Sequence, residues 1–295
     1  MTALSQAPSA CPRSDRARPT IPPVGRGRAT RPPVDLEVVI PALNEEDRLP
    51  DTLASTRSFL QRQPYRSAVV VVDNGSVDGT ADVVRRAMRG PVPVHLLGCA
   101  APGKGAAVRR GFMTGSSRHV GFMDADLATP VETLERVVPL LEAGFPTVIA
   151  SRAVTDAERV VPQGMVRRVG GEMFRAAART VLPAVADSQC GFKFFSGAVV
   201  RHVLPSCRVD GFSFDLELLG RLSRAGHAVV ELPVVWTDRA GSSFSPVKHG
   251  VRSFADTVRI HRMLAGPASR PSRTVLDLDR AVAVTHPRDE SRSGL

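Results

Sequence analysis

Two aspartates separated by one residue, Asp124 and Asp126, follow an apolar run in the stretch FMDADLAT. In an extended turn, this spacing lets two carboxylates approach one hard cation. Mg²⁺ and Mn²⁺ prefer such oxygen ligands and often bind waters and substrate phosphates as well. By the three-letter pattern alone, a solvated turn is the simpler explanation. The position directly after a strand-like segment favours a metal site that holds a diphosphate.

Polar residues also follow the other strand-like segments. Asn44 and Glu45 come after the first, Asp73 after the second and Arg152 after the fifth, while the paired aspartates end the fourth. The carboxyl ends of parallel strands share one edge of a sheet, and ligands of such sheets bind there. The sequence therefore predicts that these residues form a single site.

The elements that must position these residues alternate along the chain. Apolar and β-branched runs predict strands, and helical spacing bounded by glycine or proline predicts helices. The expected strands are 35–40, 67–73, 92–97, 119–124 and 146–151, and the expected helices are 45–63, 79–90, 103–115 and 130–143. This order predicts an α/β fold with a mostly parallel sheet and helices on both faces.

A glycine turn, GKG at 103–105, opens the third expected helix. Its spacing matches neither a Walker A loop nor GxGxxG, but such a turn at a helix N-terminus suits an anion. The chain has only three lysines, Lys104, Lys193 and Lys248, against 36 arginines (39 − 3). Each lies in a loop-like motif, so all three are candidate anion contacts.

Two further motifs lie in the second half, DSQCGFKFF at 187–195 and GFSFDLELL at 211–219. Cys190 has no neighbouring pattern that supports a nucleophile, so a buried small residue is expected. Asp215 and Glu217 begin an expected helix. Either the helix dipole favours these charges there, or one carboxylate faces a substrate, and the sequence leaves both interpretations open.

Composition limits the class of protein. Of the net charge of +10, only +4 remains (28 − 24) once residues 1–34 and 267–295 are set aside, and aromatics are 5%. A stacking surface for nucleic acid is therefore not expected. Four separated cysteines predict neither a disulfide framework nor a zinc ribbon. No apolar run predicts a membrane span or signal peptide, so the expected location is cytoplasmic.

The Pro/Arg-rich composition of residues 1–34 predicts a disordered basic arm. Residues 35–265 are expected to form one domain, and residues 266–295 a second disordered segment. Deleting the basic arm and measuring salt-dependent DNA binding tests the remaining nucleic-acid hypothesis.

The ordered motifs resemble those of family-2 glycosyltransferases with the GT-A fold, and most resemble dolichyl- or polyprenyl-phosphate β-glucosyltransferases. The resemblance runs from about residue 37 to residue 262. It is carried by VVIPALNEEDRL, VVDNGSVDGT, GKGAAVRRG, MDADLAT, ASR, DSQCGFKFF, FSFDLELL and VVWTDRAGSSFSPVK. It implies a Rossmann-like sheet with a smaller acceptor-side region. It also implies metal-dependent, inverting transfer of a sugar, with glucose from UDP-glucose to polyprenyl phosphate as the expected reaction for envelope glycosylation.

The resemblance also implies roles for individual residues. The nucleotide-sugar contacts would be Pro41, Ala42, Asn44, Glu45, Asp73, Lys104, Asp124 and Arg152. The Mg²⁺ or Mn²⁺ ligands would be Asp124 and Asp126. The acceptor or phosphate contacts would be one of Arg167 and Arg168, with Gln189, Lys193 and Lys248. The candidate catalytic carboxylates would be Asp215 and Asp187, and Trp236, Ser242 and Ser243 would belong to a loop over the donor.

Two departures from the family pattern leave the acceptor open. Members acting on polyprenyl phosphate commonly have a membrane helix, which this chain lacks, so contact at the inner face of the membrane would depend on the basic arms or on an amphipathic helix at 249–264. Ala128 stands where some lipid-phosphate sugar transferases have another polar ligand. The alternatives are a soluble acceptor, such as a natural-product aglycone, and a non-catalytic nucleotide-sugar-binding protein.

Overall fold

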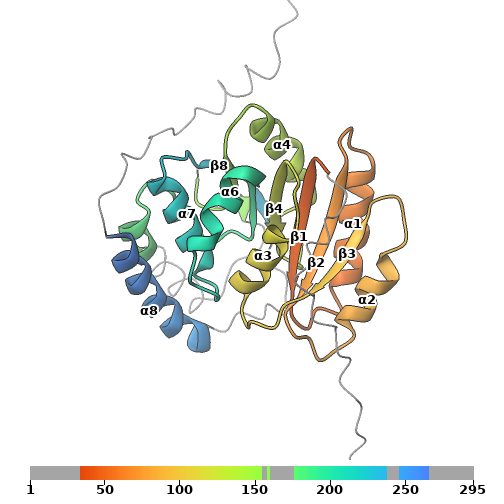
Figure 1. Ribbon diagram of the computed structural model, residues 1–295, viewed down its shortest axis with the longest axis horizontal. Helices are drawn as coiled ribbons and strands as arrows, with labels where there is room; N and C mark the ends of the chain where they lie inside the picture. Colours follow the sequence, from red (N-terminus) through yellow and green to blue (C-terminus); the bar gives the residue numbers. More distant parts are fainter. Residues whose placement is uncertain (1–33, 155–157, 160–175, 238–245, 266–295) are drawn as a thin grey trace, which may run out of the picture.

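The computed structural model describes residues 34–154, 158–159, 176–237 and 246–265 (Figure 1). Its main sheet has seven strands in the order β3-β2-β1-β4-β7-β5-β8. Their bounds are β1 Leu36–Ala42, β2 Ser67–Asp73, β3 Val94–Gly98, β4 His119–Met123, β5 Thr147–Ser151, β7 Phe192–Ser196 and β8 Val230–Pro233. The short strands β6 (Glu158–Arg159) and β9 (Val235–Trp236) pair separately. Only β7 runs antiparallel to its neighbours among these strands, so the sheet is mostly parallel.

Helices cover both faces of this sheet. Their bounds are α1 Leu49–Gln61, α2 Thr80–Ala87, α3 Lys104–Met113, α4 Leu134–Glu142, α6 Gly197–Val203, α7 Phe214–Arg224 and α8 Pro246–Leu264, with 3₁₀ turns at Val131–Thr133 and Leu204–Ser206. Helices α1, α2 and α4 contribute to one apolar cluster, while α3, α6, α7 and α8 contribute to the other. The sheet is therefore the central layer of three.

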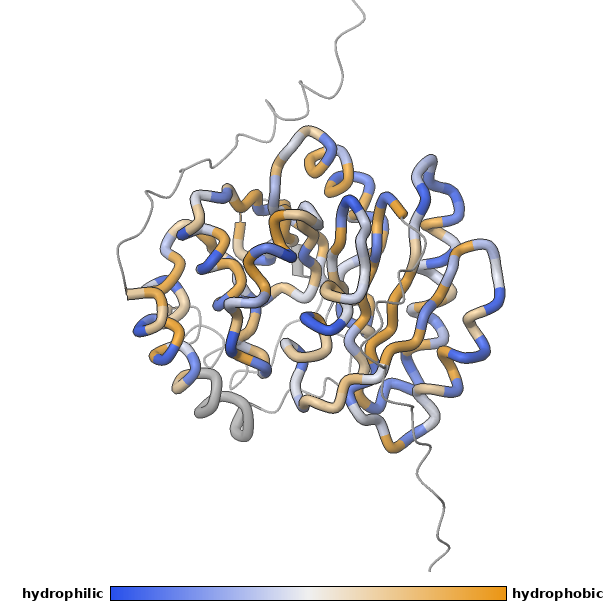
Figure 2. Tube along the Cα trace, viewed as in Figure 1, coloured by the Kyte–Doolittle hydropathy of each residue, from blue (hydrophilic) through white to orange (hydrophobic). Residues whose placement is uncertain are grey.

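The central strands are apolar on both sides because both sides are covered. Val38 and Ile40 of β1 belong to the cluster under α1, while Val39 between them belongs to the cluster under α3. Successive side chains of a strand point to opposite faces, so a strand covered twice reads as a continuous apolar run. Figure 2 shows this apolar character along the central strands.

The five strands and four helices expected up to residue 151 are confirmed, with shifted ends. Helix α1 starts at Leu49 and not at residue 45, since Pro50 occupies its first turn and lacks the amide hydrogen that a helix interior needs. Asn44 lies in the turn before this helix and does not cap it. Its backbone has a φ of 56° and its side-chain oxygen accepts a hydrogen bond from the Val77 amide.

The antiparallel strand β7 was not predicted. It lies between β4 and β5, and its alternating residues serve different faces: Phe192 and Phe194 join one cluster and Phe195 joins the other. Gly121 of β4 lies opposite Phe194, whose ring fills the space where a side chain at 121 would be. Strand β7 thus closes tightly against the strand that ends at the paired aspartates.

Helix α8 is attached to the domain through α7. Its residues Thr257, Ile260 and Leu264 are buried, and Leu264 fills the space beside Gly220 of α7. The expected amphipathic helix at 249–264 is thus confirmed as a helix, and one side of it is packed. Among the helices that the structure describes, none combines the length and apolarity required to cross a membrane.

The packing of α4 near the end of α1 can be tested at Tyr65, the only tyrosine of the chain. Tyr65 packs against the apolar cluster under α1 and α4. Burial, and then the charges of Glu142 and Glu135, raise the pKa of its hydroxyl to about 12. We expect the phenolate absorbance of native protein, measured by rapid pH jump, to titrate near that value and not near the ordinary pKa of about 10.

The same protein in guanidinium chloride is the control, and its phenolate should form near pH 10. Because folding raises this pKa, Tyr65 stabilises the fold below about pH 10 and the stabilisation is lost as the pH rises toward 12. A native midpoint equal to the denatured one would contradict the placement of α4 beside Tyr65.

Candidate active site

The loops after β1 and β2 are joined by hydrogen bonds. The backbone amide of Asn44 donates to the Ser76 hydroxyl over 2.9 Å, and the backbone amide of Glu45 donates to the Thr80 hydroxyl over 2.8 Å. In return, the Glu46 carboxylate accepts from the Gly79 amide at 2.6 Å. Residues more than 30 positions apart therefore form one surface at the carboxyl edge of the sheet.

Asp73 and Asn74 extend this surface to the glycine turn. Asp73 is buried at the end of β2 and accepts the Ser76 amide at 2.9 Å. Asn74 donates to the carbonyl of Ala101 at 2.7 Å and accepts from the Gly103 amide at 2.7 Å. Gly103 has a φ of +121°, which a residue with a side chain rarely adopts. Sequence reasoning missed Asn74, although its place in the turn DNGS was a signal.

Lys104 is the first residue of α3, and its ammonium lies 2.7 Å from the Asp124 carboxylate at the end of β4. It also lies 5.2 Å from the centre of the Phe122 ring. Burial by itself would lower the pKa of Lys104, but the charges of Asp124 and Asp215 raise it above its ordinary value. Lys104 is therefore a fixed positive charge at the site.

Asp124 is held in place by the segment before β7. Its amide donates to the Gly191 carbonyl over 2.9 Å. A side chain at Gly191 would occupy the position of the Asp124 carboxylate, so only glycine leaves room for it. Gly191 was also missed as a functional residue, because a lone glycine in DSQCGFK has no spacing that identifies its neighbour.

Asp126 and Glu45 lie in the same negative field. Asp126 accepts the Ala128 amide at 3.0 Å. Burial, followed by the charge of Asp124, raises the pKa of Asp126. Burial also raises the pKa of Glu45; Arg48 opposes this shift, while Asp126 and Asp124 add to it. Burial is thus the larger cause of both shifts, and neighbouring carboxylates add to it.

This donor set fits Mg²⁺ or Mn²⁺, since both cations prefer carboxylate oxygens. Asp124 and Asp126 would be its protein ligands. Within the described ranges, no group of three or more His, Cys, Asp or Glu side chains is assembled to hold a metal ion. A cation bound there would therefore take its remaining ligands from water and from substrate phosphate.

Arg152 and Asp187 form a second ion pair at this edge of the sheet. The Arg152 guanidinium donates to both carboxylate oxygens of Asp187, over 2.7 Å and 2.9 Å. Burial opposes the charge on Asp187, but Arg152 outweighs it and holds the pKa of Asp187 well below its usual range. Asp187 thus positions Arg152, which also lies 5.4 Å from the Trp236 ring. The predicted catalytic role of Asp187 stays a prediction.

Lys193 and Asp215 form a third pair, more deeply buried. The ammonium of Lys193 lies 3.1 Å from Asp215 and also donates to the Cys190 carbonyl. Lys193 is 0% exposed, and its predicted contact with the acceptor stays a prediction. Its nitrogen lies 5.3 Å from the Phe122 ring, the ring that Lys104 also approaches. The expected burial of Cys190 is confirmed.

The two acidic residues in the first turn of α7, Asp215 and Glu217, have different partners. Glu217 accepts the amides of Arg208 and Val209 at 2.8 Å and 2.7 Å, and it pairs with Arg221. It therefore fixes the loop before α7. Asp215 contacts Lys193 and lies in the field of Lys104, so Asp215 is the carboxylate associated with the site.

The structure describes some of the other predicted contacts and not the rest. Pro41 and Ala42 end β1, with Pro41 half-buried and Ala42 buried. Gln189 is half-buried, and its backbone amide donates to the Asp187 carboxylate over 3.2 Å. Arg167, Arg168, Ser242 and Ser243 lie outside the described residues. Lys248 lies in α8, in the part of that helix whose side chains the structure does not describe.

Comparison with known proteins agrees with this arrangement. The family model described as glycosyl transferase family 2 matches residues 37–202. A dolichyl-phosphate beta-glucosyltransferase of Dictyostelium discoideum is 29% identical over 252 residues, covering 79% of this chain and 77% of that protein. Proteins of the same name from Drosophila melanogaster and Homo sapiens are 30% identical, each over 73% of this chain and 71% of the relative.

Solved structures share the fold. The glucosyl-3-phosphoglycerate synthase of Mycobacterium tuberculosis, in complex with phosphoglyceric acid, superposes with a TM-score of 0.59 and 20% identity, covering 80% of this chain and 81% of that one. Its complex with Mg²⁺ and UDP gives the same values. The expected GT-A fold is thus confirmed, and the chain is a glycosyltransferase that belongs to glycosyl transferase family 2.

Proposed function

We propose that this glycosyltransferase moves glucose from UDP-glucose to a polyprenyl phosphate of the dolichyl type, with Mg²⁺ or Mn²⁺ as cofactor. The observation that carries the proposal is the contact of Asp124 with Lys104 over 2.7 Å, beside the half-buried Asp126, whose pKa is raised by burial and by the charge of Asp124. A lysine ammonium beside a pair of carboxylates that could bind a metal suits a nucleoside diphosphate as leaving group, because positive charge stabilises the negative charge that develops on it. The names of the relatives that match most of this chain support glucose and dolichyl phosphate.

On the donor side, the chain supplies shape and charge. The joined loops after β1 and β2 present Asn44, Glu45 and the buried Asp73 to the nucleoside. Lys104 and Arg152 supply positive charge near the two phosphates, and each is held by its own carboxylate. When bound at Asp124 and Asp126, a divalent cation would neutralise charge on the diphosphate.

The reaction breaks the bond between the anomeric carbon of glucose and the oxygen of the β-phosphate. The bonding electron pair stays with UDP, and an oxygen of the acceptor phosphate forms the new bond from the opposite side. Because that phosphate is already anionic, it needs orientation more than proton removal. Asp215, buried against Lys193, orients the acceptor side of the site in this proposal.

The direct test is incubation of the protein with a panel of labelled UDP- and GDP-sugars, with and without polyprenyl phosphate. Radioactivity that enters the organic phase only with UDP-glucose and polyprenyl phosphate supports the proposal. A water-soluble glycoside formed from a soluble acceptor, with no lipid product, would select the alternative acceptor class.

We expect Asp126→Asn to reduce the transfer rate by about 100-fold or more, an effect typical of losing one group that stabilises charge on a leaving group. Asp82→Asn is the matched control, since Asp82 is an exposed carboxylate on α2 that pairs with Arg85. Rates are measured at saturating Mg²⁺ or Mn²⁺, with thermal unfolding as the check on folding. Near-normal turnover of folded Asp126→Asn would remove Asp126 from the ligand set.

We expect Gly191→Ala to slow transfer by about 10-fold or more, because the new methyl group would displace the Asp124 carboxylate. The steric cost to folding should be about 1–3 kcal/mol, as for other small-to-large changes in packed regions. Gly211→Ala is the control, because its nearest neighbour would be an Asp256 oxygen at 3.8 Å. Equal rates for both folded variants would show that the position of Asp124 does not limit transfer.

A further inference from the structure

An exposed side of α8, beside its buried side, carries a stripe formed by Phe254, Val258, His261 and Ala265, the residue that follows the helix. Their spacing of four, three and four residues puts them on one side of a helix. Phe254 is 59% exposed and Val258 is 40% exposed, and His261 and Ala265 are also exposed. We name these four residues the α8 stripe.

The α8 stripe is not the side by which the helix is attached. Thr257, Ile260 and Leu264 are buried, and Leu264 packs beside Gly220 of α7. Figure 1 shows α8 at the rim of the molecule, far from α2. The buried side chains fix the helix on the domain, so the exposed apolar residues of the α8 stripe lie on a firmly held surface.

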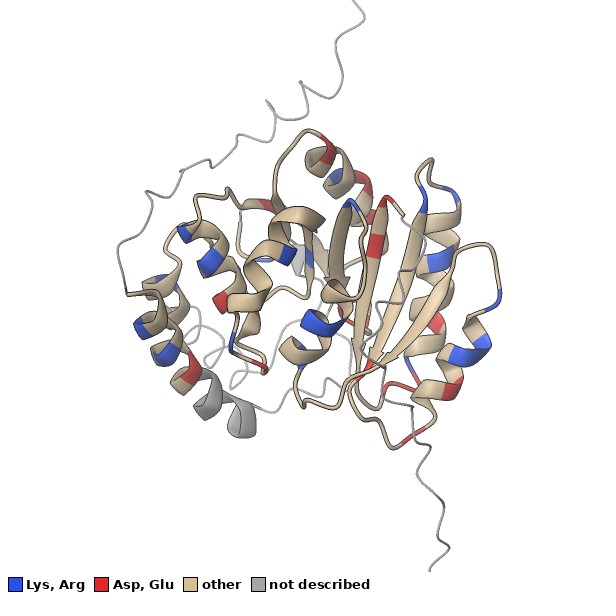
Figure 3. Ribbon diagram, viewed as in Figure 1, with Lys and Arg blue, Asp and Glu red and all other residues tan. Residues whose placement is uncertain are grey.

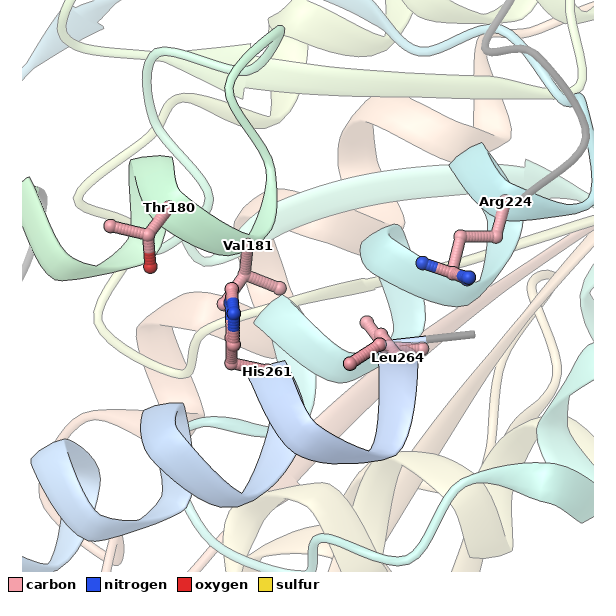
Figure 4. A pocket seen from close by; sticks show the side chains of 6 residues that line it. Thr180, Val181, Arg224, His261 and Leu264 are labelled. Atoms are coloured by element: carbon pink, nitrogen blue, oxygen red, sulfur yellow. The ribbon is translucent and has the colours of Figure 1, made fainter. Parts of the chain in front are cut away.

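The stripe leads into a cavity of about 140 Å³ at the end of α8. The lining residues come from α7, α8 and the helical segment at 176–181. They are Thr180, Val181, Arg224, His261, Leu264 and Ala265 (Figure 4). His261 and Ala265 belong to both the stripe and the cavity, so an apolar surface continues into a pocket with a hydroxyl, an imidazole and a guanidinium.

The charge around the stripe is positive. Arg259 and Arg262 are exposed on α8, and Arg179 is exposed on the neighbouring helical segment. In the sequence of α8, Asp256 is the single acid, and it is half-buried. Figure 3 shows basic residues along the end of α8. The surface therefore combines exposed apolar side chains with cations, the pattern of helices that lie in a membrane interface.

We propose that the α8 stripe docks this enzyme on an anionic lipid bilayer. Phe254 and Val258 enter the boundary between headgroups and acyl chains, and lipid phosphates contact Arg259, Arg262 and the cavity beside Arg224. The proposal rests on the proposed function, because a polyprenyl phosphate acceptor is held in a bilayer and the enzyme must meet it there.

The small apolar area favours a bilayer over a second copy of the chain. A stable protein interface buries roughly 1,200 Å² or more in total. The described stripe offers two large apolar side chains, Phe254 and Val258, with arginines beside them. In two copies meeting at this face, those like charges would oppose each other, whereas an anionic bilayer neutralises them.

The experiment measures sedimentation of the full chain with phosphatidylcholine vesicles that contain or lack phosphatidylglycerol. We expect strong binding only with phosphatidylglycerol. Arg259→Gln with Arg262→Gln should weaken it about 20-fold at low salt, since each arginine near the surface contributes about 1 kcal/mol, or about fivefold. Phe254→Ser with Val258→Ser should weaken it at least tenfold at high salt, where screened charges contribute little.

Controls come from α2, away from α8. Met88→Ser changes a side chain that is 46% exposed, and Arg86→Gln changes an exposed arginine; both should bind vesicles as the wild type does. Binding by the two α8 double variants that equals the wild type overturns the proposal. A wild-type dimer that these variants convert to monomer, measured by light scattering without vesicles, also overturns it and assigns the surface to a second copy.

Sugar transfer separates this proposal from the proposed function. In detergent with a short-chain polyprenyl phosphate, the α8 double variants should keep the wild-type rate, because their changes lie outside the site. On phosphatidylglycerol vesicles that contain polyprenyl phosphate, they should be slower by the same factor as their binding. Lipid docking without any transfer to polyprenyl phosphate contradicts the proposed function alone.

Discussion

The contact between Asp124 and Lys104 is the interaction on which the site depends. Asp124 lies beside Asp126, and burial, together with the neighbouring carboxylates, disfavours the charged forms of Asp126 and Glu45. Lys104 supplies a compensating positive charge from the first turn of α3, and Gly191 leaves the room that the Asp124 carboxylate needs. Three separate segments must meet correctly before the pair exists.

The aspartates of the three ion pairs at the site differ in how exposed they are to solvent. The Asp124 side chain is 39% exposed, whereas the carboxylates of Asp187 and Asp215 are 2% and 3% exposed. A buried ion pair adds little net stability, because desolvation cancels much of the attraction. Pairs such as Lys193–Asp215 are therefore better explained as devices that hold charges in fixed positions near a substrate than as sources of fold stability.

The sequence predicts the parallel half of the fold well because the signals there are local. Runs such as VVVV in β2 need no distant partner to be recognised as a buried strand. Strand β7 pairs with residues 69–77 positions earlier in β4 and 44–48 positions earlier in β5, and nothing in FKFF indicates that it runs antiparallel. Asp215 and Glu217 both lie in the first turn of their helix, and their partners, Lys193 for one and Arg221 for the other, distinguish them.

Helix α7 connects the site to the α8 surface. Asp215 lies in its first turn, and Arg224, its last residue, lines the cavity where the α8 stripe ends. Nine steps along a helix span about 14 Å, so a single rigid element sets the distance between Asp215 and the cavity. Since Leu264 of α8 packs on Gly220 of the same helix, the docking surface and the site are fixed to one another. If α8 docks on a bilayer as proposed, that bilayer lies at a constant distance from Asp215, which suits the proposed transfer to a membrane-held acceptor.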